Sequence, residues 1–124
     1  MKIIETPIFT KKVTSLLSED EYRKLQNELV SNPEKGKIIP GIGGLRKIRW
    51  KISGRWKSSG VRTIYYWISK NETILMLFMY RKNIQDDLTS SQLKILKSLV
   101  EKELKWITKY SMNLKPALSK VEKY

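Results

Sequence analysis

The chain has 124 residues and carries 25 lysines and arginines against 12 aspartates and glutamates, for a formal net charge of +13. A chain of this length forms one domain with one modest core, and its 40% hydrophobic residues are too many for a disordered basic tail. It contains no cysteine and no histidine, which excludes disulfides, thiolate metal sites and every nucleophile that depends on histidine. Any catalysis must therefore rely on lysine, arginine, tyrosine or carboxylates.

The sequence predicts no membrane span and no signal peptide. Its N-terminal segment lacks the apolar stretch of a secretory signal. The longest apolar run, residues 74–80, is far shorter than the roughly 20 residues that a bilayer requires. We therefore expect a soluble cytoplasmic protein with no membrane partner.

The positive charge is concentrated in one segment. Residues 35–71 hold ten lysines and arginines and no acidic residue, whereas the remaining 87 residues hold 15 basic and 12 acidic side chains, a balance of only +3. A field this concentrated attracts a polyanion, and nucleic acid is the default partner. The alternative is a basic surface that serves only solubility.

Two short amphipathic helices are predicted before the basic segment. Residues 2–5 are compatible with a strand. The Thr-Pro pair at 6–7 is a helix-start signal, and the Ser-Glu-Asp-Glu run at 18–21 forms a capping box that opens a second helix. The Asn-Pro pair at 32–33 ends that helix.

Residues 35–44 contain four glycines and a proline and are predicted to form a loop. Within it, the Gly-x-Gly-Gly run at 41–44 neither follows a clear strand nor opens a helix. A phosphate-binding glycine loop is therefore disfavoured, and a tight turn that enters a strand is preferred.

Residues 45–52 alternate as a strand with one buried face requires. One face carries Ile48, Trp50 and Ile52, and the other carries Lys47, Arg49 and Lys51. Three cations about 6.6 Å apart, two residues of strand rise per step, match the phosphate repeat of a single nucleic-acid strand. In the following Gly/Ser-rich loop, Trp56 lies between Arg55 and Lys57. Trp56 either stacks on a base or covers the end of the core.

Two further strands, 61–68 and 73–80, are predicted to complete an antiparallel meander. The last strand is apolar on both faces, which indicates an interior position. Thr89 and Gln92 form a second capping box before a long amphipathic helix. The predicted fold is α+β, with an antiparallel-rich sheet and the order β-α-α-β-β-β-α. It is a single domain over residues 1–108, followed by a flexible tail over residues 109–124.

The meander brings basic residues together at one end of the sheet. Arg62 begins the second strand, and residues 80–82, Tyr-Arg-Lys, end the third. Because neighbouring antiparallel strands place the start of one beside the end of the other, these residues form a basic pocket with one phenol. The alternative is that Arg62 and Tyr80 pair with Asp86 or Asp87 and only close the sheet edge.

The element order, the stretches GGLRKIRW and SSGVRTIYYW, and especially LFMYRKNIQDDLTSSQ, residues 77–92, resemble the RelE/HigB-type toxins of bacterial type II toxin–antitoxin systems. The resemblance spans residues 1–108. It implies a RelE-like fold and a ribosome-dependent endoribonuclease that cuts mRNA in the ribosomal decoding site. It also implies an antitoxin partner that neutralises the toxin, and contacts with mRNA and the RNA of the small ribosomal subunit.

The resemblance also assigns residues. Lys47 and Arg49 match the alternating basic pair of the family's first meander strand, and Arg62 matches the arginine that follows the hairpin glycine. Tyr80 and Lys82 match the family's Tyr-x-Lys segment. The further RNA- or ribosome-binding candidates are Arg46, Lys51, Arg55, Trp56, Lys57 and Arg81. Arg81 stands where many relatives carry a small residue, and Tyr110 is the nearest counterpart of a C-terminal tyrosine in the RelE branch.

The composition is consistent with RNA cleavage through the 2′-hydroxyl. A dense group of cations can stabilise the phosphorane, usually the largest catalytic contribution. Like-charge repulsion favours the neutral amine of Lys47, which makes it the candidate general base. Arg49 and Arg62 would bind the scissile phosphate, and Lys82 or Tyr80 would protonate the leaving oxygen. We expect no cofactor and no metal.

Two other functions compete with this hypothesis. A ParE-like toxin would act on DNA gyrase and would need no phosphate-cleaving residues. A non-catalytic RNA- or ribosome-binding module would need only the basic strands and Trp56. A DNA-binding regulator is disfavoured, since no helix-turn-helix pair carries the excess charge.

Overall fold

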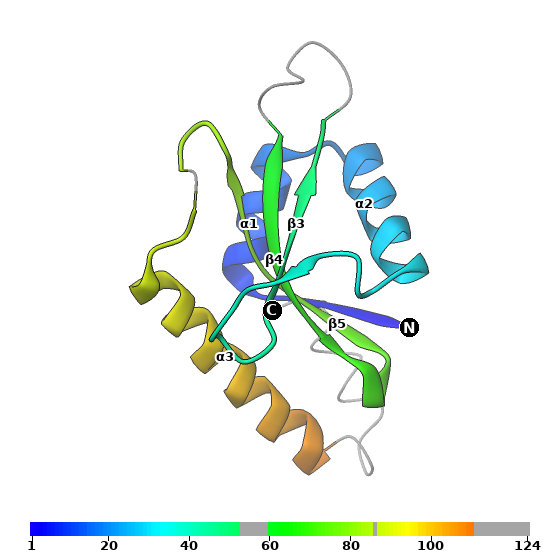
Figure 1. Ribbon diagram of the computed structural model, residues 1–124. Helices are drawn as coiled ribbons and strands as arrows, with labels where there is room; N and C mark the ends of the chain where they lie inside the picture. Colours follow the sequence, from blue (N-terminus) through cyan, green and yellow to red (C-terminus); the bar gives the residue numbers. More distant parts are fainter. Residues whose placement is uncertain (53–59, 86, 111–124) are drawn as a thin grey trace.

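The computed structural model describes residues 1–52, 60–85 and 87–110, which form a five-stranded sheet with helices on both faces (Figure 1). In chain order the elements are β1 (Lys2–Glu5), α1 (Pro7–Leu16), α2 (Glu19–Ser31), β2 (Lys37–Ile38), β3 (Arg46–Trp50), β4 (Val61–Ile68), a 3-10 helix (Ser69–Asn71), β5 (Thr73–Arg81) and α3 (Ser90–Tyr110). The strand order is β1-β5-β4-β3-β2, with β1 parallel to β5 and all other pairs antiparallel. The predicted α+β class, the meander and the interior position of β5 are confirmed.

Strand β2 is the element that the sequence did not predict. It lies inside the predicted loop 35–44, where Lys37 pairs with Lys47 and Ile38 with Arg46. Two residues are too few to establish an alternating pattern, so only the partner strand reveals them. The glycine-rich run that follows is the tight turn into β3, as predicted.

The predicted helix caps are all present. Thr6 and Ser18 cap α1 and α2, each accepting a hydrogen bond of 3.1 Å from the backbone N–H three residues further on. At α3, the N–H of Gln92 donates to the Thr89 hydroxyl at 3.1 Å, and the N–H of Thr89 donates to the Gln92 side-chain oxygen at 2.9 Å. This reciprocal capping box places the start of α3 directly after the loop that follows β5.

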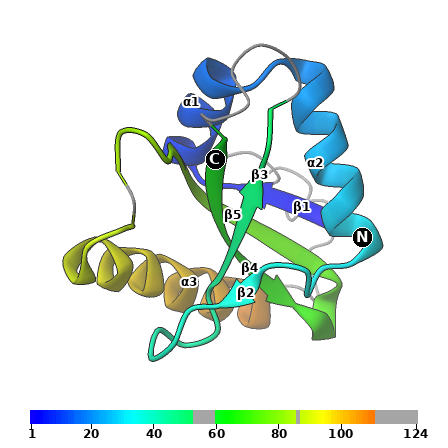
Figure 2. The same ribbon diagram turned by 45° about the horizontal axis from the view of Figure 1, so that its top comes forward.

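The two faces of the sheet carry separate hydrophobic cores (Figure 2). Helices α1 and α2 cover one face, to which they contribute Phe9 and Leu25. Helix α3 covers part of the other face through Leu96 and Val100. Because β5 is interior and covered on both sides, most of its side chains are buried. No helix in the described part of the chain is long and apolar enough to cross a membrane.

A β-bulge at Leu77 decides which face the end of β5 presents. Ile64 lies opposite Phe78, but the next residue, Tyr65, lies opposite Met76, so Leu77 is the extra residue. The Thr6 hydroxyl donates a hydrogen bond of 2.9 Å to the Leu77 carbonyl and supports this bulge. The bulge reverses the alternation of the strand. Phe78 and Tyr80 consequently face α3 instead of α1 and α2, whereas Met79 faces α1 and α2.

Three hydrogen bonds hold the first two helices on their face. The indole N–H of Trp50 donates to the carboxylate of Glu21 at 3.1 Å. The hydroxyls of Tyr22 and Thr10 donate to the Glu5 carboxylate at 2.5 and 2.7 Å. Burial, reinforced by the hydrogen bond to Glu5, raises the pKa of Tyr22 far above its usual value. Trp50 therefore has a structural partner on the side of the sheet away from the candidate site.

Candidate functional site

Three neighbouring strands bring the predicted site residues into one line across the sheet. Arg49 of β3 lies opposite Arg62 of β4, which in turn lies opposite Tyr80 of β5. Directly opposed residues project from the same face, with Cβ atoms about 5 Å apart. Lys47 lies two residues before Arg49 and therefore shares this face. We refer to Lys47, Arg49 and Arg62 as the basic cluster.

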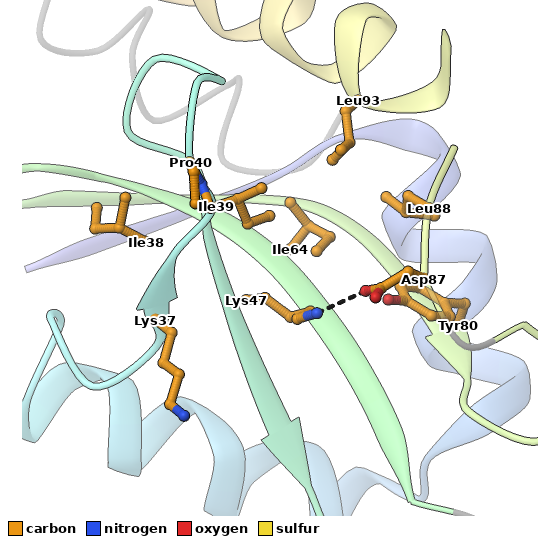
Figure 3. Close-up of a pocket in the computed structure, with 10 residues that line it drawn as sticks. All are labelled: Lys37, Ile38, Ile39, Pro40, Lys47, Ile64, Tyr80, Asp87, Leu88 and Leu93. Carbon is orange, nitrogen blue, oxygen red and sulfur yellow. Dashed lines mark hydrogen bonds and ion pairs between the residues drawn. The ribbon is translucent and has the colours of Figure 1, made fainter. Parts of the chain in front are cut away.

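A pocket of about 390 Å³ opens beside the basic cluster (Figure 3). It lies between the β2 segment, the sheet and the start of α3, and its lining comprises Lys37, Ile38, Ile39, Pro40, Lys47, Ile64, Tyr80, Asp87, Leu88 and Leu93. One part of the lining is charged or polar and the rest is aliphatic. Such a surface suits a nucleotide, because a phosphate needs cations whereas a base has apolar faces.

Asp87 forms an ion pair with Lys47 inside this pocket. The Lys47 Nζ donates to Asp87 Oδ1 at 2.6 Å (Figure 3), and the two side chains are 26% and 71% exposed. This hydrogen bond, with the charges of Lys47, Arg62 and Arg49, lowers the pKa of the Asp87 carboxyl. The carboxylate therefore contacts Lys47 and lies within the electrostatic field of Arg49 and Arg62.

The pairing differs from the alternative that the sequence left open. That alternative paired Arg62 and Tyr80 with Asp86 or Asp87, whereas the structure pairs Asp87 with Lys47. Asp86 lies outside the described residues. Lys47 therefore has a carboxylate partner as well as cationic neighbours. The Lys47 ammonium must leave Asp87 and lose a proton before it can act as a base.

Arg62 is a buried cation in the middle of this line. Its exposed fraction is 5%, and among the described residues no carboxylate lies within ion-pair distance of it. Arg49, directly opposite, carries the same charge. A buried guanidinium beside a like charge is unfavourable, and an anion bound at this point would relieve the cost.

Tyr80 and Lys82 lie at the end of β5. Tyr80 is buried, and its ring stacks on that of Phe78, with the centroids 6.0 Å apart. Lys82 is exposed in the turn after β5, where its backbone N–H donates to the carbonyl of Gly60 at 3.2 Å. Arg62 and Tyr80 are therefore part of the sheet, whereas Lys82 stands at its rim.

Of the predicted RNA-contacting residues, those that the structure describes lie in different parts of the molecule. Arg46 faces away from the basic cluster, and its guanidinium donates to the carbonyls of Glu34 and Gly36 at 3.1 and 2.8 Å. Lys51 is exposed just after β3, and Arg81 is partly exposed at the end of β5. Arg55, Trp56 and Lys57 lie outside the described residues. Arg46 thus holds the loop before β2, a structural role that the sequence did not indicate.

The sequence offered Asp87 only as an alternative partner of Arg62 and Tyr80, and it indicated neither the pairing of Asp87 with Lys47 nor the aliphatic side of the pocket. Lys47 and Asp87 are separated by 40 positions, and no periodicity relates them. Ile39 and Pro40 belonged to a predicted loop, and Leu93 to the core stripe of α3. Only the packing of the β2 segment against the start of α3 turns them into a lining.

Among the described residues, no group of three or more histidine, cysteine, aspartate or glutamate side chains could hold a metal ion. The donors assembled at the site are lysine, arginine and tyrosine. Their chemistry favours an anion.

A comparison with known protein families finds no match for this sequence. A comparison with solved structures finds a similar fold in the RelE toxin of E. coli, in a variant with two arginines replaced by alanine, determined in the free state. The two chains share 15% sequence identity and superpose with a TM-score of 0.51, over 68% of this chain and 86% of the toxin. The protein therefore has a RelE-like fold, as the sequence predicted.

Proposed function

We propose that this protein is the toxin of a toxin–antitoxin pair, a ribosome-dependent endoribonuclease that cuts mRNA in the decoding site. The RelE-like fold supports this proposal. The observation that carries it is the line of Arg49, Arg62 and Tyr80 across three strands, in which Arg62 is 95% buried and no described carboxylate pairs with it. A buried guanidinium with an exposed arginine beside it is suited to bind a phosphate.

The chemistry needs neither histidine nor a cofactor. The 2′-oxygen attacks the neighbouring phosphorus as its proton leaves, the bond from phosphorus to the 5′-oxygen breaks, and that oxygen takes up a proton. The products are a 2′,3′-cyclic phosphate and a 5′-hydroxyl. In our proposal Arg49 and Arg62 hold the phosphate and stabilise the charge that develops on it. Lys47 Nζ, released from Asp87 and with a free lone pair once its extra proton has passed to water, accepts the 2′-proton, and Tyr80 or Lys82 supplies the proton to the 5′-oxygen.

The pocket beside the basic cluster would hold a base next to the scissile phosphate. Its aliphatic side, which includes Ile39, Ile64 and Leu93, offers surface to the face of a base. Lys47 lines this pocket and also belongs to the basic cluster. The proposed partners are therefore mRNA, the RNA of the small ribosomal subunit, and an antitoxin protein, and the place of action is the cytoplasm.

The test is cleavage of mRNA on bacterial ribosomes programmed with a defined codon in the decoding site, followed by primer extension. We expect cuts within that codon, and Arg62→Ala should slow cleavage by about 100-fold or more, as loss of a group that stabilises transition-state charge does. Lys47→Ala should also slow it. Arg23→Ala, at a side chain 68% exposed on α2, is the matched control and should retain full activity.

Three outcomes would contradict the proposal. One is full cleavage by a folded Arg62→Ala variant, and another is cleavage that does not depend on ribosomes. The third is inhibition of DNA gyrase without RNA cleavage, which would favour the ParE-like alternative. For the partner, growth arrest on expression should be relieved by co-expression of the protein encoded beside this one.

A further inference from the structure

The strongest unexplained feature of the site is that an acidic side chain occupies its cationic centre. Asp87 Oδ1 accepts a hydrogen bond of 2.6 Å from Lys47 Nζ. Its carboxylate also experiences the charges of Arg49 and Arg62. A phosphate oxygen recruited by the basic cluster would seek the same Nζ and the same field. Asp87 and a phosphate are therefore competitors for one position.

Hydrogen bonds from the side chain of Gln85 hold the backbone at Asp87 in place. The Gln85 amide donates to the backbone carbonyl of Asp87 at 2.7 Å and to the side-chain oxygen of Gln92 at 2.8 Å. The next residue, Leu88, is buried in the core under α3. The backbone at Asp87 is thus fixed between a hydrogen-bonded glutamine and a buried leucine, which aims the carboxylate at Lys47.

The Asp87 side chain itself is free to leave. It is 71% exposed, so water can solvate the carboxylate once the ion pair opens, and an exposed ion pair of this kind is worth little. Release therefore requires a rotation of the Asp87 side chain and no rearrangement of the sheet or of α3.

We propose that Asp87 is an internal substitute for the substrate phosphate. It pairs with Lys47 and offsets part of the charge of the basic cluster in the free protein, and it is displaced from Lys47 when a nucleic-acid phosphate binds. This inference deepens the proposed function and rests on the cluster being a nucleic-acid phosphate site. Asp87 is a positioning residue that acts through Lys47, since its hydrogen bond fixes the position of Nζ until phosphate replaces it.

The test measures binding of a single-stranded hexadeoxynucleotide, which carries phosphates but no 2′-hydroxyl and so cannot be cut by the proposed chemistry. Asp87→Asn should bind about two- to fivefold more tightly than the wild type, the range expected when an exposed competing ion pair is removed. Asp20→Asn is the matched control, because it removes the same charge from another exposed pair, Asp20 with Arg23, on α2. It should change the affinity much less than Asp87→Asn.

Asp87→Asn in a Lys47→Gln background tests whether the gain in affinity depends on Lys47. In Lys47→Gln, adding Asp87→Asn should give no further gain, because the competed group is gone. Thermal unfolding supplies an independent readout: Asp87→Asn should leave the melting temperature unchanged or slightly lower while it strengthens binding. A purely structural role would change stability without the gain in affinity.

The outcomes separate this inference from the proposed function. Equal affinities of Asp87→Asn and Asp20→Asn would overturn the competition, even if ribosome-dependent cleavage is observed. A gain that persists in the Lys47→Gln background would overturn Lys47 as the contested group. No oligonucleotide binding by any variant would overturn the phosphate site itself and this inference with it.

Discussion

Arg62 is the residue at which stability and function oppose each other most directly. Its guanidinium is buried beside the like charge of Arg49, and no described carboxylate lies within ion-pair distance of it. Folding therefore pays for a desolvated cation. Such an arrangement persists in a protein where a ligand uses it.

We predict that Arg62→Met raises the free energy of unfolding by about 1 kcal/mol, because an apolar side chain of similar length replaces a buried charge. The same variant should lose ribosome-dependent cleavage. Chemical denaturation and the cleavage assay measure the two effects. Arg23→Met on α2, 68% exposed, should change stability by less than about 0.5 kcal/mol. A clear loss of stability in Arg62→Met would mean that Arg62 is a structural residue.

Position 36 needs a glycine because a larger side chain would not fit there. A Cβ there would lie 2.7 Å from both Cε1 and the hydroxyl of Tyr65, and 3.1 Å from the carbonyl oxygen of Lys47. The Tyr65 hydroxyl in turn accepts from the N–H of Gly36 at 2.8 Å and donates to the carbonyl of Pro33 at 2.7 Å. These contacts hold the chain that leads into β2 and thereby one wall of the pocket.

Gly36→Ala should consequently destabilise the fold by about 1–3 kcal/mol, the usual cost of an overpacked site. Tyr65→Phe should also destabilise it, and the double variant should cost less than the sum, because the two residues form one contact. Urea denaturation of the four proteins gives the coupling. Tyr66→Phe is the control and should be near neutral. Strict additivity would contradict the contact.

Among the elements, α3 has a capped N-terminus and, near its C-terminal end, a buried carboxylate oxygen without a hydrogen bond. Glu103 of this helix has a carboxylate oxygen that is buried and makes no hydrogen bond. Burial raises the pKa of this carboxyl. A group whose pKa is higher in the folded than in the unfolded state binds its proton more tightly in the fold. The stability contributed by that proton is lost as the pH rises through the folded pKa.

We therefore expect Glu103→Gln to be more stable than the wild type at neutral pH. The advantage should shrink as the pH falls from neutral toward about 4, and it should be gone below that, where the wild-type carboxyl is protonated in both states. Denaturation curves across this pH range test it. Glu101→Gln, at an exposed position of the same helix, is the control and should show no such trend. A constant difference at every pH would contradict the assignment to Glu103.

The bulge in β5 is the element-level feature on which the site depends. The alternation before Leu77 would direct Tyr80 toward α1 and α2, and the extra residue turns it toward α3 and into line with Arg62. Periodicity in the sequence predicted the strand and its burial. It could not reveal the bulge, because the strand is apolar on both faces and either alternation buries apolar side chains.

For the whole molecule, the net charge of +13 makes nucleic-acid binding depend on salt. Each phosphate neutralised on a single strand contributes about 0.7 to the slope of log affinity against log salt concentration. Arg49→Gln removes an exposed cation of the basic cluster and should lower the slope for a single-stranded oligonucleotide by about that amount. Lys24→Gln, 63% exposed on α2, should leave the slope unchanged. Equal slopes for Arg49→Gln and the wild type would exclude a phosphate contact at Arg49.

From the sequence alone we could predict the order of the main elements, the three helix caps, the burial of β5 and the basic character of β3. These features are local, because caps depend on residues three apart, and helices and strands follow periods of 3.6 and 2. Only the folded chain reveals the pairing of β2, the bulge at Leu77, the burial of Arg62 and the ion pair of Lys47 with Asp87. Each of these depends on strand register and on side chains from distant segments meeting at one point. The concentration of positive charge is therefore visible in the sequence, whereas the carboxylate of Asp87 that pairs with Lys47 is visible only in the fold.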